Sequence, residues 1–257
     1  MNSSRSSSLA ALLLVLVLAV GAAGAATVSQ ADAPSEAQVG SDVQATFVLT
    51  ELFQNPSLEQ WSLEGDTELR NVTWTVQVDN QAGSQIAQET YDGQTFEHPV
   101  DLDNGDNEIR VTLTGTVPPV ENYTYSPAEQ FRFAELSQAR QGGTSDVIES
   151  YETHHYTEDS RTARQAIDSA QAAIEAAGGH QEAQRTLNSA IDAYESEPPN
   201  FELATDLANQ AEDTATKAQS SQNRNRLILM AVGALVLIGL VVGAVIYWRR
   251  SRTHSRL

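Results

Sequence analysis

An uncharged apolar run near the C-terminus constrains this chain more than any other feature of its sequence. The run is Leu227–Trp248, and none of its 22 residues is charged. A helix of this length extends about 33 Å, which is enough to cross a hydrocarbon core of about 30 Å. A helix buried in a globular core rarely lacks a polar face over six turns. We therefore expect residues 227–248 to form one transmembrane helix.

The charges beside this run indicate its orientation. Four arginines follow it within the last nine residues, whereas only Arg224 and Arg226 precede it closely. Cytoplasmic flanks carry the excess of cations, so the C-terminal end is expected inside. The residues predicted to set this topology are Arg249, Arg250, Arg252 and Arg256. Residues 249–257 then form a basic cytoplasmic tail, which suits contact with a partner or with anionic lipid.

A second apolar run, Leu9–Val20, lies at the N-terminus. It follows a polar leader that contains Arg5, and it precedes a Gly/Ala segment with Ala23 and Ala25. A positive leader, a short apolar centre and a small-residue exit are the parts of a secretory signal peptide. We expect residues 1–25 to be removed, and the alternative is an uncleaved membrane anchor. The two runs predict a single-pass type I membrane protein with extracellular N-terminal domains and a cytoplasmic C-terminus.

The segment between the two runs is strongly acidic. It holds all 34 Asp and Glu residues but only eight of the 15 Lys and Arg residues, so its formal charge is −26. Such a charge repels itself in dilute buffer, whereas at 1 M salt the screening length falls to about 3 Å. Binding to nucleic-acid phosphates needs a basic surface, so we expect no nucleic-acid partner.

The composition of the whole chain resembles that of surface proteins from extremely halophilic archaea. It has one lysine against 14 arginines and is rich in Ala, Gly, Thr, Asp and Glu. This resemblance concerns habitat, and it implies an exterior on which Asn-linked glycans are common. The alternative is an ordinary acidic surface protein. A halophilic origin predicts that the extracellular part loses its fold below about 0.5 M salt.

Residues 42–136 alternate between apolar and polar side chains, as half-buried antiparallel strands do. The clearest run places Val72, Trp74, Val76 and Val78 on one face, and we expect Trp74 to be a core ring rather than a ligand platform. Turn signals such as Asn104-Gly105 separate such runs. We therefore predict an all-β sandwich of six or seven strands, preceded by a flexible tether at residues 26–41.

Two segments of this region, NVTWTVQVDNQAG and GDNEIRVTLTGTVP, are similar to Ig-like and fibronectin-like domains of prokaryotic surface proteins. The region also contains two glycosylation sequons, Asn71-Val72-Thr73 and Asn122-Tyr123-Thr124, so Asn71 and Asn122 are candidate glycan acceptors. The acidic stretch Asp101–Glu108 fits a hairpin turn, and a site for a hard cation is the alternative.

The next segment, residues 137–158, reads as a linker, and residues 159–221 have helical spacing. Small or apolar residues recur there at alternating steps of four and three, which predicts three helices with a heptad-like seam. Gly178-Gly179 and Pro198-Pro199 mark the breaks between them. We expect an antiparallel three-helix bundle, with a tetratricopeptide-like arrangement as the alternative. The third helix either continues into residues 227–248 or ends in a loose joint at 220–223.

Candidate chemistry is sparse. Gly239 and Gly243 form a GxxxG pair that permits close packing of transmembrane helices, and hence a homodimer. His154-His155 lies near several carboxylates, but the segment reads as a solvated linker rather than a zinc site. The chain has no cysteine, so thiolate metal sites and Cys nucleophiles are excluded. We expect no catalytic residue, no cofactor and no metal, and we do not expect an enzyme.

Two functions fit this sequence. The first is a non-enzymatic protein of the cell envelope, whose sandwich presents a loop face, either Phe53–Trp61 or Val117–Tyr125, to an envelope protein or a glycan. The second is a receptor or accessory subunit of a membrane complex for transport or signalling. Such a subunit would couple extracellular binding through the helical segment to a membrane partner.

Overall fold

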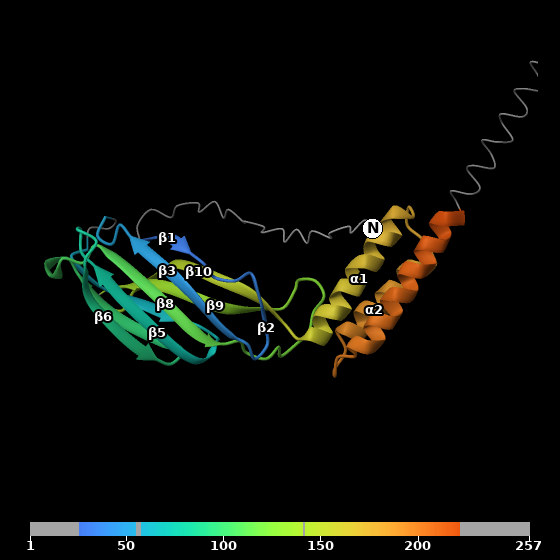
Figure 1. Ribbon diagram of the computed structural model, residues 1–257, viewed down its shortest axis with the longest axis horizontal. Helices are drawn as coiled ribbons and strands as arrows, with labels where there is room; N and C mark the ends of the chain where they lie inside the picture. Colours follow the sequence, from blue (N-terminus) through green and yellow to red (C-terminus); the bar gives the residue numbers. More distant parts are fainter. Residues whose placement is uncertain (1–25, 55–57, 141, 222–257) are drawn as a thin grey trace, which may run out of the picture.

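The structure, a computed structural model, describes residues 26–54, 58–140 and 142–221. They form an elongated molecule, with a β-sandwich at one end and helices at the other (Figure 1). The signal peptide predicted at 1–25, the transmembrane helix predicted at 227–248 and the tail at 249–257 lie outside the described residues. Within the described ranges, no helix combines the length and the apolar character that crossing a bilayer requires.

In the residues that the structure describes, ten strands form two five-stranded sheets. The first sheet has the order β1-β3-β8-β5-β6 and the second the order β2-β10-β9-β4-β7. The first sheet consists of β1 (Thr27–Ala31), β3 (Asp42–Thr50), β8 (Glu108–Thr116), β5 (Arg70–Asp79) and β6 (Gln85–Asp92). The second consists of β2 (Glu36–Gln38), β10 (Ser145–Tyr156), β9 (Gln130–Ala139), β4 (Gln60–Asp66) and β7 (Thr95–Asp101). The pairs are antiparallel except for β2 with β10, which is parallel.

The alternation predicted for residues 72–78 is confirmed. Val72, Trp74, Val76 and Val78 are all buried, whereas the residues between them are partly exposed. Trp74 is fully buried, and its ring centroid lies 4.9 Å from that of Phe96 on β7. Burial of such side chains contributes about 1.5–3 kcal/mol each to stability. Trp74 is therefore a core residue, as the sequence indicates.

The sandwich is larger than predicted, with ten strands instead of six or seven. Residues 26–41 contain β1 and β2 and are not a simple tether. Residues 137–158 contain the end of β9 and all of β10, so they are not a linker. The sequence pattern does not reveal these strands, because β1 and β2 lie at sheet margins and most residues in the N-terminal half of β10 are exposed. Their sequences consequently lack the alternation that marks a half-buried strand.

Between the sandwich and residue 221, where the described residues end, the chain forms three helices, as predicted. They are α1 (Glu158–Ala176), α2 (Gln181–Tyr194) and a helix at residues 201–221. The predicted seam is buried except for the half-buried Ala218, and its best-buried members are Ala163, Ile167, Ala170, Ala183, Leu187, Ala190, Tyr194, Ala204, Ala208, Ala211 and Ala215. Gly178 and Gly179 have φ of 76° and 83° and lie between α1 and α2, where glycine adopts a left-handed backbone without strain.

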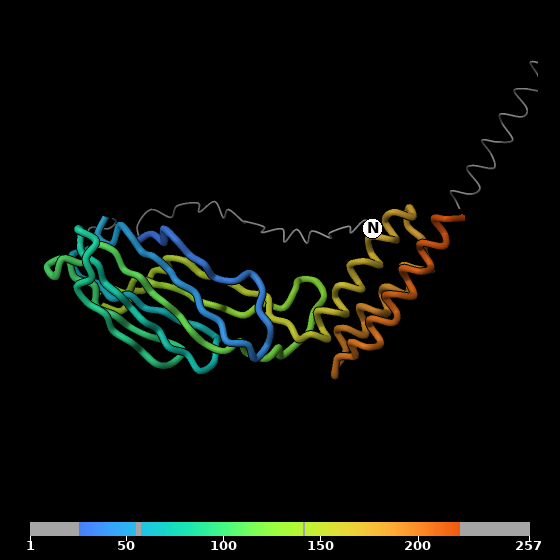
Figure 2. Tube along the Cα trace, in the orientation of Figure 1, coloured from blue at the N-terminus to red at the C-terminus, as the bar shows by residue number. Residues whose placement is uncertain are grey.

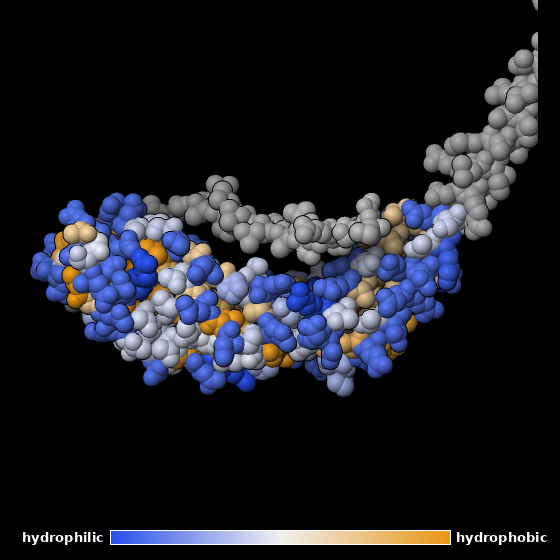
Figure 3. Space-filling view, viewed as in Figure 1, coloured by the Kyte–Doolittle hydropathy of each residue, from blue (hydrophilic) through white to orange (hydrophobic). Residues whose placement is uncertain are grey.

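Side-chain contacts fix the direction of the third helix. The Ser169 hydroxyl donates to Glu212, and the Gln219 amide donates to the carbonyl of Ala176. Both contacts have a separation of 43 residues, so α1 and the helix at 201–221 run in parallel. The chain returns between them through α2, as Figure 2 traces. The face shown in Figure 3 is mainly hydrophilic over both the sandwich and the helices.

Candidate functional site

The sandwich and the helices meet at a cluster of polar and aromatic side chains, of which Glu129 and Tyr194 are buried. β10 ends at Tyr156 and α1 begins at Glu158, so only Thr157 separates them. Thr157 caps α1 in a reciprocal pair of hydrogen bonds with Ser160. The segment 117–129, which connects β8 to β9, lies against the base of α1 and α2 (Figure 2). The helices are thus attached to the sandwich at two places.

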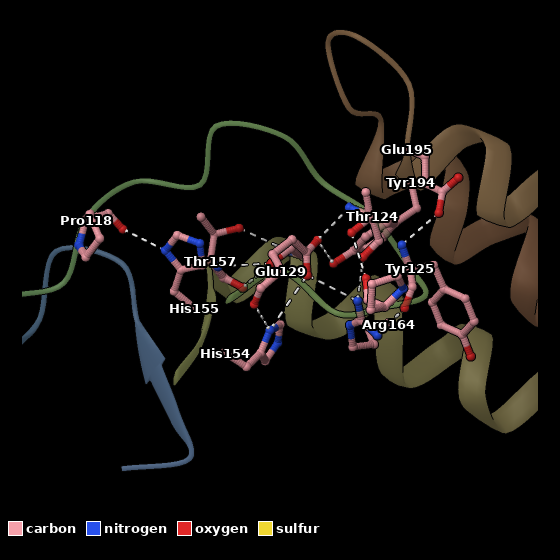
Figure 4. Close-up of polar contacts among 12 residues, drawn as sticks. Pro118, Thr124, Tyr125, Glu129, His154, His155, Thr157, Arg164, Tyr194 and Glu195 are labelled. Carbon is pink, nitrogen blue, oxygen red and sulfur yellow. Dashed lines mark hydrogen bonds and ion pairs between the residues drawn. The ribbon is translucent and has the colours of Figure 1, made fainter. Parts of the chain in front are cut away.

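Glu129 lies at the centre of this cluster (Figure 4). Its side chain is only 3% exposed and accepts three hydrogen bonds. Arg164 Nη2 donates at 3.1 Å, the Tyr194 hydroxyl at 2.9 Å and the backbone N–H of Thr124 at 3.1 Å. These donors come from α1, α2 and the segment 117–129. Burying a carboxylate is tolerated when it is paired and hydrogen-bonded in this way.

Arg164 connects α1 to the same segment. Its guanidinium donates to the carbonyl oxygens of Thr124 and Tyr125, each at 2.8 Å. It also lies over two aromatic rings, 5.1 Å from the centroid of Tyr125 and 5.4 Å from that of Tyr194. Such cation–π contacts are worth about 0.5–1 kcal/mol when exposed and more when desolvated. We call Thr124, Tyr125, Glu129, Arg164 and Tyr194 the joint.

The two tyrosines of the joint are held as neutral hydroxyls. Burial raises the pKa of Tyr194, and the nearby Glu129 carboxylate raises it further while Arg164 opposes the shift. Burial, together with a hydrogen bond of 2.6 Å to Asp168, raises the pKa of Tyr125 to about 12. The backbone N–H of Tyr125 donates to Glu195 at 2.8 Å. The hydroxyl and backbone of Tyr125 therefore fasten the segment 117–129 to α1 and to the residue that follows α2.

The two adjacent histidines belong to β10 instead of a solvated linker. His154 Nδ1 lies 2.8 Å from the carbonyl oxygen of Glu129 and 3.7 Å from its carboxylate. His155 is buried, its Nδ1 lies 3.1 Å from the carbonyl of Pro118, and burial lowers its pKa. His154 thus contacts the C-terminal end of the segment 117–129, and His155 contacts its N-terminal end. In the part of the chain that the structure describes, no three His, Asp or Glu residues are grouped to hold a metal ion.

The chemistry of the joint is that of a structural connection. Each oxygen of the Glu129 carboxylate accepts a hydrogen bond from within the protein, and Arg164 is engaged by the same carboxylate and two carbonyls. A general acid or base needs a proton-accepting atom within reach of a substrate, whereas these atoms are occupied by neighbours. The joint therefore holds the two modules together.

The two candidate glycan acceptors differ. Asn71 occupies an irregularity where β5 pairs with β8, has a φ of 50°, and donates from its side chain to the Thr116 hydroxyl. Asn71 is exposed, and Asn tolerates the left-handed region better than most residues. Asn122 is exposed in the segment 117–129. Its neighbour Thr124 is also exposed, and its hydroxyl donates to the carbonyl of Pro127.

The acidic stretch at 101–108 is a turn. Asp101 caps the short helix η1 (Leu102–Asn104), and its backbone N–H donates to Asp106 at 2.9 Å. Gly105 follows with a φ of 83°, which suits the end of such a turn. These hydrogen bonds engage the carboxylates of Asp101 and Asp106, two of the four acidic residues that the sequence offers as a cation site.

The two loops predicted to form a binding face are both partly packed against the rest of the protein. Val117–Tyr125 contacts the helices through Tyr123 and Tyr125, whereas Glu121 and Asn122 of the same loop are exposed. In the other loop, Phe53 and Leu58 pack against the core, and the Trp61 indole donates to the carbonyl of Leu52. Gly239, Gly243 and the four tail arginines lie outside the described residues.

Sequence reasoning missed the joint. Glu129 and Arg164 are ordinary residues in a chain with 34 acids and 14 arginines. One signal was present: Tyr194 ends a seam otherwise made of small aliphatic residues, and a buried tyrosine hydroxyl needs a hydrogen-bond partner. That partner is Glu129, 65 positions away.

Comparisons with known proteins add little. No protein-family model matches the sequence, and no curated protein matches it. Solved structures that align with part of the chain include a DUF4466 family protein from Parabacteroides merdae, the C-terminal domain of wzt and a structure named BspA_C_WT. Their identities are 12%, 8% and 9%, and their TM-scores are 0.28, 0.25 and 0.27.

These alignments cover 51%, 52% and 47% of this chain and 45%, 75% and 45% of the three solved chains. The chain therefore spans less than half the length of the first and third. Likeness at such TM-scores carries no argument about function. The assignment of the fold rests on the strands of this chain and their pairing.

Proposed function

We propose that this chain is a non-enzymatic surface protein of the cell envelope, in which the sandwich is an interaction module carried on a helical stem. The observation that carries this proposal is the joint, because it fixes the sandwich to α1 and α2 through buried and half-buried charged and aromatic contacts. A module held in this way projects its far end away from the helices (Figure 1).

The finer parts of the proposal come from the sequence. The stem leads through residues 222–226 into the apolar run 227–248 and then into the arginine-rich tail. In this arrangement the sandwich lies outside the membrane and the tail inside. The charge of −26 suits an exterior of high salt, and a glycan on Asn122 would cover the segment 117–129 beside the joint.

The absence of cysteine from the chain makes a direct test of this topology possible. Ser150→Cys places a thiol on the exposed surface of β10, and Ser255→Cys places one in the tail. A membrane-impermeant maleimide added to intact cells should label the first variant and should label the second only after lysis. The reverse pattern would overturn the proposal. Ser189→Cys on α2 is the matched control, and it should behave like Ser150→Cys.

A second function is favoured by the same joint. A sandwich fixed to the stem can transmit a change in position to a membrane partner, which is the behaviour of a receptor or an accessory subunit. The two functions differ in their partners. A membrane complex predicts a partner that co-purifies with residues 201–257 in detergent after the sandwich is cleaved off, whereas a surface interaction module predicts that the partner is lost with the sandwich.

A further inference from the structure

Four strands lie at the margins of the two sheets. β1 and β6 end the first sheet, and β2 and β7 end the second. A marginal strand presents unpaired backbone N–H and C=O groups, which are a template for pairing with another strand. Proteins commonly protect such strands by keeping them short, or by placing a bulge or a proline in them.

Three of these margins are protected. β1 has five residues and its register shifts between Val28 and Gln30. β2 has three residues and pairs only with residues 154–156 of β10, and the edge of β10 that it leaves uncovered is interrupted by two shifts of register with β9. β7 contains Pro99, which has no backbone N–H to donate. Strand addition at any of these margins would be interrupted within a few residues.

β6 is different. It has eight residues, Gln85–Asp92, which include no proline, and its register with β5 shifts only at the end next to Asp79. Every residue of β6 except Tyr91 is exposed. β6 lies at the margin of its sheet beyond β5 (Figure 1). It is therefore the long and regular margin of the sandwich, and both of its faces are accessible.

A groove of about 860 Å³ runs beside this margin. Tyr91 of β6 and Phe96 of β7 both line it, and their rings are stacked with centroids 5.5 Å apart. The carboxylates that line the groove are Glu64, Asp66, Asp92, Glu97 and Glu135. Arg132 pairs with Asp66 and Glu135, whereas Glu64, Asp92 and Glu97 have no ion-pair partner among the described residues. The groove therefore combines the half-buried Tyr91 ring with three uncompensated carboxylates, which suits the stem and head of an arginine or lysine side chain.

Glu89 adds a charge on the core side of β6. It pairs with the buried Val76 of β5, and residues directly opposite each other share a face of the sheet. Its side chain is 56% exposed, accepts a hydrogen bond of 2.5 Å from the Tyr91 hydroxyl, and lies 3.6 Å from His98 Nδ1. A carboxylate in this position disfavours the addition of an apolar or acidic strand and favours the addition of a basic one.

We propose that the β6 margin binds an extended, positively charged segment of a partner protein by strand addition, with arginine or lysine side chains facing Glu89 and the groove. Main-chain hydrogen bonds supply the affinity, and the carboxylates select the sequence. This inference rests on the proposed function, since it names the contact by which the sandwich acts as an interaction module. Charge repulsion disfavours parallel, in-register pairing with β6 of a second copy of this chain, because the two Glu89 side chains would then lie side by side.

Three fluorescent peptides test the proposal on the full-length chain in detergent, at a salt concentration where circular dichroism shows it folded. The first is Val-Arg-Thr-Arg-Thr-Arg-Val. The second has Glu in place of Arg, and the third is the Arg peptide with N-methylated backbone amides on its pairing edge. By fluorescence anisotropy, the Arg peptide should bind at least about tenfold more tightly than the other two. It should also slow hydrogen exchange of the amides in residues 85–92.

Charge reversal provides a matched pair of variants. Glu89→Lys with Glu97→Lys should invert the preference toward the Glu peptide. Glu202→Lys with Asp206→Lys makes the same charge change on the exposed surface of the third helix and should leave the preference unchanged. Equal binding of the Arg and N-methylated peptides, protection outside residues 85–92, or no binding would overturn the proposal. The maleimide test can fail while this one succeeds, so the two failures are distinguishable.

Discussion

Arg164→Leu is the substitution that most directly weakens the connection between the sandwich and the helices. The substitution removes the cation that pairs with the Glu129 carboxylate. The Glu129 side chain is only 3% exposed. Removing one partner of a buried ion pair costs about 3–5 kcal/mol, because the remaining charge stays desolvated. The two hydrogen bonds from Arg164 to the carbonyls of Thr124 and Tyr125 are lost as well, at about 1 kcal/mol each. We expect a total loss of at least about 3 kcal/mol.

A second substitution separates the ion pair from the general loss of packing. Glu129→Gln keeps the size of the side chain and one acceptor oxygen, so the double variant with Arg164→Leu should be less destabilised than the sum of the single variants. The expected coupling energy is at least about 1.5 kcal/mol. Arg132→Leu is the matched control, because Arg132 lies 2.9 Å from Asp66 in an exposed ion pair and should cost less than about 1 kcal/mol.

Two signals report the two modules during urea unfolding. Tryptophan fluorescence follows the sandwich, which contains Trp61 and Trp74, and circular dichroism at 222 nm follows the helices. The signals should change together in the natural protein, whereas in Arg164→Leu the helical signal should be lost at lower urea. The reasoning is refuted if the transitions still coincide, the coupling energy is below about 0.5 kcal/mol, and Arg132→Leu costs as much as Arg164→Leu.

Three further predictions follow from single residues. Burial lowers the pKa of His98 and His155, so below about pH 6.5 the unfolded chain binds more protons and the free energy of unfolding should fall by up to about 1.4 kcal/mol per pH unit for each histidine. Urea titrations between about pH 5 and about pH 7.5 check this, and a slope that is unchanged in both His98→Gln and His155→Gln contradicts it. Gly65→Ala places a Cβ 2.2 Å from Phe96 Cε1 and should lower the free energy of unfolding by about 1–3 kcal/mol. An unchanged urea midpoint would contradict this, because it would mean that Phe96 moves aside without destabilising the core. Mass spectrometry of the protein from its own membranes should find a glycan on Asn122 and none on Asn71, and the opposite pattern would reject this assignment.

The parts of the fold that could be predicted are those whose two faces differ. β5 alternates because Trp74 and its neighbours face the core while the intervening residues face outward. The helices are recognisable because Ala163 and Ile167 begin a seam that repeats at helical spacing. The helix breaks are visible in Gly178-Gly179, where the backbone takes the left-handed conformation.

The remaining parts depend on contacts that local patterns do not encode. β10 reads as a linker because few of its residues, such as Ile148 and Tyr151, pack against the core. Its polar side chains are explained by neighbours distant in sequence, as with His155 and the carbonyl of Pro118. The joint is the extreme case, since Glu129 and Arg164 are 35 residues apart and each is unremarkable alone. Only the pairing of β9 with β10, followed directly by α1, brings them together.

The distance between the two modules in solution tests most directly whether the sandwich and helices act as one body. Arg110→Cys on β8 and Ser189→Cys on α2 are exposed sites for spin labels in a chain with no other cysteine. In the full-length protein, pulsed electron resonance should give a single narrow distance distribution that broadens when Arg164→Leu is added. A broad or bimodal distribution in the protein with Arg164 intact would contradict a fixed joint.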